Sequence, residues 1–139
     1  MALIDEIKSL ACQLEALGHQ ATTPCRGDGG ASNPSAGEAP SSLPKAFFVA
    51  DHLNKIKGCD ALLIANFPKG RVEGYVGTSA LMEAAMAYAL GKGIFLLNPP
   101  ADTSVAGELE ALGAIFVEGE LGRLKLWRPV SVSHGGDLV

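Results

Sequence analysis

The amino-acid sequence predicts an α/β fold, a doubly wound parallel sheet of the flavodoxin or Rossmann-like three-layer kind. Residues 60–66 (DALLIAN) and 94–97 (IFLL) are short, nearly uninterrupted apolar runs. Such runs are typical of strands that are covered on both faces. Segments with apolar residues at helical spacing separate them along the chain. Strands that alternate with helices in this way form parallel βαβ units.

The first third of the chain predicts helix, strand, loop and helix. Apolar residues recur at helical spacing from Leu3 to Leu17, and Gly18 follows as a C-cap signal. Gln20–Thr23 is a short strand candidate ended by Pro24. Residues 25–44 are rich in Gly, Ser, Ala and Pro, which predicts a flexible loop. Lys45–Lys57 then predicts a second helix, which Gly58 stops.

The remaining elements follow the same alternation. After strand 60–66, we expect a helix at Thr78–Leu90, a strand at Ile94–Leu97 and a helix at Ser104–Leu112. Ala114–Val117 predicts a last short strand of a domain that spans residues 1–121. The C-terminal extension, residues 122–139, carries a further strand candidate at Leu124–Val132.

Composition excludes several classes of protein. The 139 residues carry a formal charge of −4 in scattered positions, which argues against nucleic-acid binding. Three widely spaced cysteines without a CxxC pair favour reduced thiols in a cytoplasmic protein and no metal site. No apolar run approaches the ~20 residues of a membrane span. The chain also lacks the P-loop and the GxGxxG pattern, and no cofactor is predicted.

Polar residues follow the two apolar strands and define one candidate site. Open α/β sheets bind ligands outside the carboxyl ends of their strands. Asn66 with its following loop, Asn98, and the beginning of the 78–90 helix are all expected at that edge.

Glu83 is the lone carboxylate inside an otherwise apolar helix. It shares a helical face with Met82, Met86, Ala87 and Leu90, so its side chain is expected to point at the core or into a crevice beside it. A carboxylate in such a position can serve as nucleophile or base. The alternative is a single buried hydrogen bond with no chemistry. Before the helix, Gly74 and Gly77 permit a ligand to approach the backbone, and Thr78 or Ser79 is the expected N-cap or ligand donor.

The run from Asp51 to Pro100, continued by the Glu108 helix and AIFVEGEL, resembles the nucleoside 2-deoxyribosyltransferase-like family. The likeness covers roughly residues 3–121 and is concentrated between 52 and 100. This family of small α/β proteins includes transferases that exchange bases on 2′-deoxyribose and hydrolases that remove bases from nucleotides. The resemblance implies that Glu83 is the nucleophile, which attacks C1′ and forms a glycosyl-enzyme ester that water or a second base resolves.

The resemblance also implies roles for other residues. Asp51 and His52 are nearest to the position where some hydrolases carry an Asp, and His52 could act as acid or base, or be a partly exposed helix histidine. Lys69 and Arg71 could meet a 5′-phosphate or simply be solvated. The implied partner is a nucleoside or nucleotide, and a homo-oligomer is expected. The residues predicted to bind substrate are Asn66, Lys69, Gly74, Tyr75, Gly77, Thr78, Ser79 and Asn98.

The chain departs from the family pattern at two places. The chain starts inside the helix that follows the family's first strand, which predicts an unfilled slot between strands 20–23 and 60–66. The alternatives are a truncated or misassigned start, or a slot filled by Leu124–Val132 or by a partner chain. The stretch before Glu83 reads GTSALM and lacks the acidic residue of the transferases, so Thr78 or Ser79 would have to replace it. A catalytically degenerate nucleotide-binding or interaction module is therefore the alternative. A phosphoribohydrolase with the loop PGGxGTxxE fits less well, because Glu83 comes two residues too late.

Overall fold

The computed structural model of the protein describes residues 2–23 and 44–126, apart from the side chains of residues 2–4 and 126. The predicted loop 25–44, except for Pro44, and the extension beyond residue 126 lie outside the described residues. The described helices are α1 (Ala2–Ala16), α2 (Lys45–Gly58), α3 (Thr78–Ala89), α4 (Thr103–Ala111) and the 3₁₀ helix η1 (Leu121–Leu126). The strands are β1 (Ala61–Ile64), β2 (Gly93–Leu96) and β3 (Ile115–Phe116).

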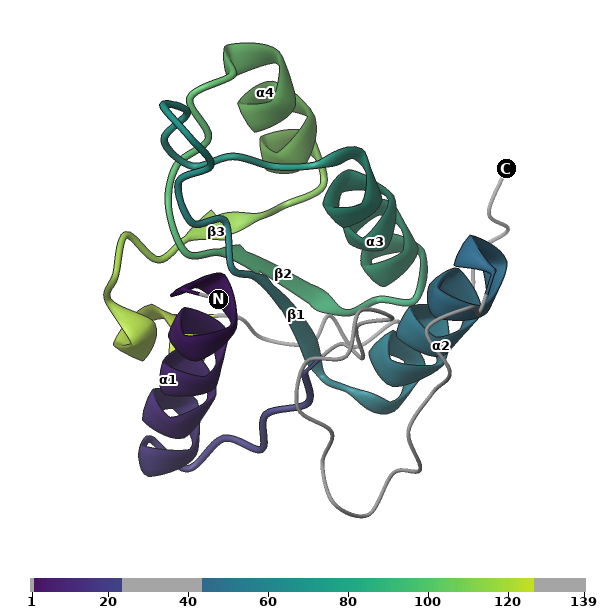
Figure 1. Ribbon diagram of the computed structural model, residues 1–139. Helices are drawn as coiled ribbons and strands as arrows, with labels where there is room; N and C mark the ends of the chain where they lie inside the picture. The colour runs from purple at the N-terminus through teal and green to yellow at the C-terminus, as the bar shows by residue number, and fades with distance from the viewer. Residues whose placement is uncertain (1, 24–43, 127–139) are drawn as a thin grey trace.

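The three strands form a parallel sheet in the order β1-β2-β3 (Figure 1). Leu62 is aligned with Ile94 across the first pair, and Phe95 with Ile115 across the second. All four residues of β2 are buried, as its continuous apolar sequence predicts for a central parallel strand. The coarse prediction is confirmed: the protein is α/β with a parallel sheet and helices between its strands.

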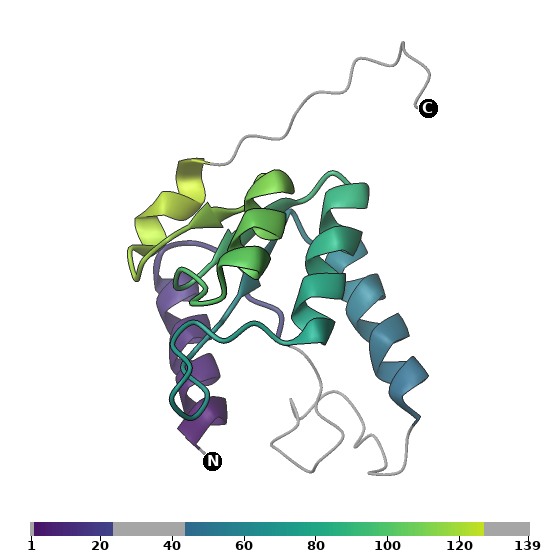
Figure 2. The same cartoon turned by 90° about the horizontal axis from the view of Figure 1, so that it is seen from above.

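Helices cover both faces of the sheet. On one face α2, α3 and α4 lie side by side (Figure 2), and Ile56, Ala84, Ala87 and Leu109 from these helices join β1 and β2 in one hydrophobic cluster. On the other face a second cluster includes Leu10 of α1, Leu121 of η1 and Phe95 of β2. Each face of β2 therefore contributes to a different core cluster. None of the described helices is long and apolar enough to cross a bilayer.

Helix ends agree with the predicted positions to within one or two residues. Gly18 has a φ of +89°, and its N–H and that of His19 bond to carbonyl groups of the last turn of α1, which is a glycine C-cap. Asp102 caps α4: its carboxylate accepts hydrogen bonds from the N–H groups of Ser104 at 2.9 Å and Val105 at 3.3 Å.

The prediction of a strand at Gln20–Thr23 is wrong. These four residues belong to no regular element, and Gln20, Thr22 and Thr23 are exposed. The segment has only one apolar residue, Ala21, so it has no face to bury against the sheet. Consequently β1 has a strand neighbour on one side only within the described part of the chain, and the predicted slot is not bounded by a second strand.

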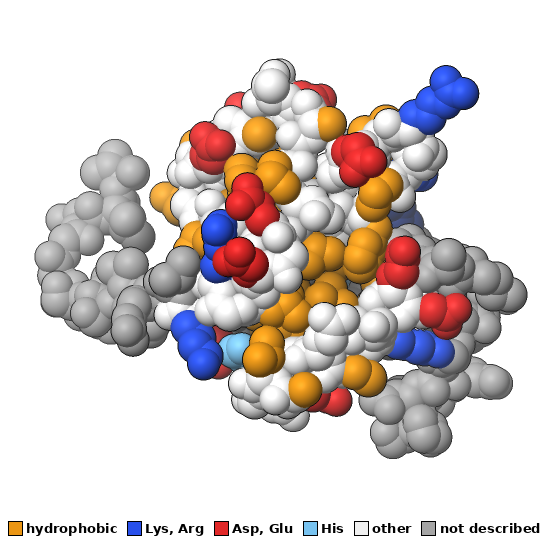
Figure 3. Space-filling view, turned by 90° about the vertical axis from the view of Figure 1, so that its left-hand side faces the viewer, with side chains coloured by type: hydrophobic (Ala, Val, Ile, Leu, Met, Phe, Trp, Pro, Cys, Tyr) orange, Lys and Arg blue, Asp and Glu red, His pale blue; other side chains and the backbone are white. Residues whose placement is uncertain are grey.

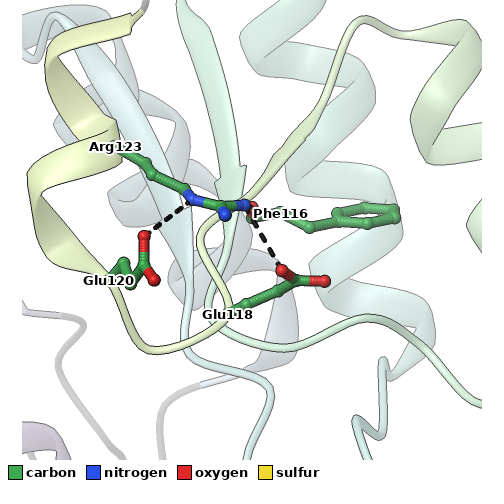
Figure 4. Close-up of polar contacts among 4 residues, drawn as sticks. All are labelled: Phe116, Glu118, Glu120 and Arg123. Atoms are coloured by element: carbon green, nitrogen blue, oxygen red, sulfur yellow. Dashed lines mark hydrogen bonds and ion pairs between the residues drawn. The ribbon is translucent and has the colours of Figure 1, made fainter.

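The strand predicted from Leu124 is also wrong over its described part, because residues 121–126 form η1. Arg123 holds this turn against the end of β3 (Figure 4): its guanidinium donates to the Phe116 carbonyl at 3.2 Å. The same side chain contacts the carboxylates of Glu118 at 3.3 Å and Glu120 at 3.2 Å. Leu121 can thereby bury its side chain in the α1 face of the core. The rest of the predicted strand lies outside the described residues.

Candidate functional site

Glu83 and His52 contact each other directly. His52 Nδ1 lies 2.6 Å from Glu83 Oε1, a short hydrogen bond between residues 31 positions apart. The two side chains are only 23% and 21% exposed. His52 Nε2 is buried and has no hydrogen-bond partner among the described residues. The structure therefore brings together the two residues that the sequence singled out separately for catalysis.

The packing of α2 against α3 positions this pair. Ala84 and Ala87 turn one face of α3 to the core, where both are fully buried. Glu83 is then about a quarter-turn away around the helix and reaches toward α2. Ile56, one turn after His52, anchors α2 in the same core cluster. Glu83 thus lies in a crevice beside the core, as predicted, whereas Ala87 belongs to the core itself.

The crevice beside the pair is small. Val49, His52, Ser79, Met82, Glu83 and Met86 line a pocket with a volume of about 20 Å³. This volume corresponds to roughly one water molecule. The walls are apolar except for the pair and the Ser79 hydroxyl. A substrate as large as a nucleoside requires α2 and α3 to separate, or Met82 and Met86 to move aside.

Asp51, the third predicted catalytic residue, has a different partner. Its carboxylate lies 2.8 Å from Lys55 Nζ, one turn further along α2. Lys55 Nζ also lies 3.4 Å from the Thr23 carbonyl oxygen. Asp51 is not a lining residue of the pocket at Glu83. Its observed contact is an i,i+4 ion pair of the kind that stabilises helices modestly.

Asn66 and Asn98 join the ends of β1 and β2. Asn66 is 2% exposed, and its amide nitrogen donates to the Asn98 carbonyl at 2.6 Å. Its Oδ1 accepts the Asn98 backbone N–H at 2.9 Å. The Asn98 side chain in turn lies 3.4 Å from the Asn66 carbonyl oxygen. Both predicted substrate-binding residues thus bond to each other, and the polar character of position 66 has a structural explanation.

The loop between β1 and α3 is packed closely at Gly74. This residue has a φ of +58°, and a Cβ added there would clash with the Pro99 carbonyl oxygen. The backbone that approaches Gly74 is therefore the chain's own. In the same loop Lys69 Nζ lies 4.7 Å from the centre of the Tyr75 ring, a cation–π contact. Lys69 and Tyr75, both predicted to bind substrate, are exposed and interact with each other.

The predicted capping role of Thr78 or Ser79 is wrong. Gly77 is the N-cap of α3, and no side chain caps the helix. Thr78 is already the first helical residue, so its hydroxyl cannot take the N-cap geometry. Of the two hydroxyl residues, only Ser79 lines the pocket with Glu83.

A second, larger hollow lies at the carboxyl ends of the strands. Phe67 and Leu97, which follow β1 and β2, form part of its floor, and its volume is about 300 Å³. Figure 3 shows this side of the molecule, where hydrophobic side chains gather in the hollow. Sequence analysis placed a site at this edge but did not identify the residues of α1 that border it, because their polar pattern is ordinary for an exposed helix face. The lining residues are Glu6, Ser9, Leu10, Gln13, Phe67, Leu97, Gly119 and Leu121.

The predicted site residues thus fall into separate groups. Glu83, His52 and Ser79 share one crevice, while Asn66, Asn98 and Gly74 bond or pack together at the strand ends. No hydrogen bond among the described residues joins the two groups, and the described residues contain no cluster of three metal-ligating side chains. Comparison of the chain with family models, with curated proteins and with solved structures finds no match.

Proposed function

We propose that this protein cleaves or transfers the N-glycosidic bond of a (deoxy)nucleoside or nucleotide, with Glu83 as the nucleophile. The observation that carries the proposal is the 2.6 Å contact between Glu83 and His52 in a crevice between two helices. Carboxylates held by an imidazole in this way are typical of activated nucleophiles and bases. The flavodoxin-like sheet has the strand order 2-1-3-4-5. In the proposed topology β1, β2 and β3 correspond to strands 3, 4 and 5 of that order.

The contact assigns different tasks to the two oxygens of Glu83. Oε1 is held by His52, whereas Oε2 has no hydrogen bond among the described residues. In the proposed reaction Oε2 attacks C1′, the bond from C1′ to the base nitrogen breaks, and a glycosyl ester of Glu83 forms. Attack of water, or of a second base, on C1′ then breaks the ester and regenerates the carboxylate.

His52 acts in this scheme as a positioning residue. An acid that protonates the departing base must lie on the opposite face of the sugar from the nucleophile. His52 contacts Glu83 itself, so it stands on the nucleophile's side. The proton for the base therefore comes from solvent or from a group outside the pair. His52 Nε2 remains available to a hydroxyl of the sugar or to the water of the second step.

A second candidate function rests on the size of the crevice. About 20 Å³ is too small for a sugar, and the amide of Asn66 is already bonded to Asn98. These observations favour a binding or interaction module in which the pair Glu83–His52 ties α2 to α3 without turnover. The two candidates differ in whether the crevice opens to a substrate.

A measurement of base release distinguishes the two candidate functions. Purified protein is incubated with deoxynucleosides and nucleoside monophosphates, with and without a free acceptor base, and released or exchanged base is followed by chromatography. Glu83→Gln keeps the shape of the side chain and abolishes nucleophilic attack, so activity should fall by at least about 10³-fold. Glu110→Gln, on the exposed side of α4, is the matched control and should retain activity. Turnover that survives in E83Q would exclude Glu83 as the nucleophile, and absence of turnover in the native chain would favour the module.

A further inference from the structure

The larger hollow, at the carboxyl ends of the strands, lies on the opposite face of the sheet from the Glu83 crevice. Leu10, Leu97 and Leu121, which line it, belong to the hydrophobic cluster on the α1 face. Glu83 belongs to α3, whose buried residues join the cluster on the other face. Within the described part of the chain the two pockets share no lining residue. We call the larger space the α1 hollow, and it is a site separate from the pair Glu83–His52.

The floor of the α1 hollow is apolar and comes from several elements. Leu10 of α1, Leu97 after β2 and Leu121 of η1 are all buried. Phe67, which follows β1, is half-buried and adds an aromatic ring. The volume of about 300 Å³ is at the small end of the range for ligand pockets. An aromatic ring in a ligand would gain from contact with Phe67 beyond its buried area. The floor therefore fits a ligand with a small aromatic body.

The polar side chains of the α1 hollow all come from α1. Glu6, Ser9 and Gln13 line it and follow one another at intervals of three and four residues, which places them along one side of the helix. The Gln13 side-chain amide donates to Ser9 Oγ at 3.4 Å. Its carbonyl oxygen and the Glu6 carboxylate remain as acceptors. The backbone N–H of Gly119, another lining residue, already bonds to the Leu97 carbonyl at 3.2 Å. The hollow thus favours a ligand that donates hydrogen bonds.

Glu6 gives the α1 hollow a negative charge. It is the only charged side chain among the described lining residues, and no ion pair between described residues involves it. Glu118 and Glu120, by contrast, share the guanidinium of Arg123. Figure 3 shows further acidic side chains around the hydrophobic ones on this side of the molecule. Since a carboxylate attracts cations and repels anions, the charge of the hollow selects a cationic ligand.

We infer that the α1 hollow binds a small arylalkylamine, an amine joined through a short chain to an aromatic ring. The ring lies on the apolar floor beside Phe67, and the ammonium group lies at the Glu6 carboxylate. An ammonium has three N–H donors, which Glu6 and, one turn further along α1, Ser9 Oγ can accept. This ligand differs in place and in charge from the substrate proposed for Glu83. The inference holds whether or not the protein acts on N-glycosidic bonds.

Titration of isotope-labelled native protein with phenethylamine, followed by two-dimensional NMR, tests the inference. The backbone amide signals of Ser9, Gly119 and Leu121 should shift, with a dissociation constant of about 1 mM for a probe of this size. Hydrocinnamate has the same ring and carries a negative charge in place of the ammonium, so it should bind at least about tenfold more weakly. Ethylamine, which has no ring, should not shift these signals in the same concentration range.

Two variants test the wall of the hollow. Glu6→Gln removes the charge at nearly constant size and should weaken phenethylamine binding about threefold to fivefold, as expected for an exposed ion pair. Glu15→Gln is the matched control: it is exposed, lies two and a half turns further along α1 on its opposite side, and should bind as the native chain does. Ser9→Phe places a ring in the hollow from an exposed position and should weaken binding at least about tenfold, because two rings compete for one small volume.

Circular dichroism checks that each variant is folded. Absence of shifts at about ten times the expected dissociation constant overturns the inference, as do shifts centred on Ser79 and Glu83. Native affinity in S9F, or equal affinity for phenethylamine and hydrocinnamate, also overturns it. Native affinity in E6Q overturns the place assigned to the ammonium group. Base release is measured separately, so a failure of this site and a failure of the N-glycosidic activity remain distinguishable.

Discussion

Replacement of Asn66 by Ala tests whether this residue is structural or reserved for a ligand. The substitution removes the hydrogen bonds of 2.6 Å and 2.9 Å to Asn98 and a weak one of 3.4 Å to the Gly74 carbonyl. Each net hydrogen bond is worth about 1 kcal/mol, and a buried partner left unsatisfied costs about 1–3 kcal/mol. We therefore expect Asn66→Ala to lower the free energy of unfolding by about 2–4 kcal/mol, a large part of a typical total of about 5–15 kcal/mol.

Asn66→Asp sharpens the same test. A carboxylate can still accept the Asn98 N–H, but it has no N–H group for the Asn98 and Gly74 carbonyl groups, and its oxygen would face theirs. We expect it to destabilise the protein at least as much as Ala does. Asn54→Ala, on an exposed turn of α2, is the control and should change stability by less than about 0.5 kcal/mol.

Urea unfolding followed by circular dichroism measures these differences as shifts in midpoint at constant slope. A loss of less than about 0.5 kcal/mol in N66A would refute the reasoning. It would mean that the Asn98 backbone finds other partners when the amide is absent. The amide of Asn66 would then be available for a substrate, as the sequence analysis first predicted.

Two further predictions concern the loop between β1 and α3 and the N-terminal cap of α4. Gly74→Ala should cost about 3 kcal/mol or more, because it combines a left-handed φ with a clash against Pro99, whereas Gly70→Ala, with a φ of +62° and open space, should cost only about 1–2 kcal/mol. Equal losses of unfolding free energy in the two variants would contradict the close packing at Pro99. Asp102→Ala should cost about 1 kcal/mol through loss of the α4 cap, and Asp102→Asn, which keeps the acceptor oxygen, should lose only a few tenths. Thermal or urea unfolding measures the stability of each variant. Equal stability of the two Asp102 variants would contradict the capping role.

The parts of the fold that the sequence predicted are those that depend on local pattern. Leu10 and Leu14 recur at helical spacing and do pack on the α1 face of the sheet. The run Ile94–Leu97 has no polar residue and is buried throughout. In both cases the spacing of the apolar residues fits one type of secondary structure, so the sequence alone is sufficient to predict the element.

The failures concern segments whose structure depends on distant partners. Gln20–Thr23 has the length of a strand, but a strand requires a neighbour to bond with, and sequence alone does not show whether one exists. Leu124 was placed in a strand by its apolar neighbours, whereas Arg123 fixes that turn through the Phe116 carbonyl, seven residues earlier. A charged side chain that bonds to a backbone carbonyl leaves no periodic signal.

The site shows the same division. The sequence identified Glu83 because a carboxylate interrupts an apolar helix, and it named His52 through a family resemblance. It could not predict their contact, because this depends on how α2 and α3 cross. Nor could it predict that Asn66 and Asn98 bond to each other, since both follow strands and each alone has the pattern of a ligand-binding residue.

The short helix α3 presents three different sides. Ala84 and Ala87 fill the core, and Glu83 reaches toward His52. The exposed side carries Thr78, Met82, Ala85 and Ala89. A helix that only covered the sheet would need one apolar face, the one with Ala84 and Ala87. Its outward face could carry Lys and Glu without loss of stability. Met82 is 52% exposed and also lines the Glu83 pocket, so the outward face of α3 borders the crevice proposed for chemistry. A nucleoside can enter this pocket of about 20 Å³ only when Met82 or Met86 moves aside or α2 and α3 separate.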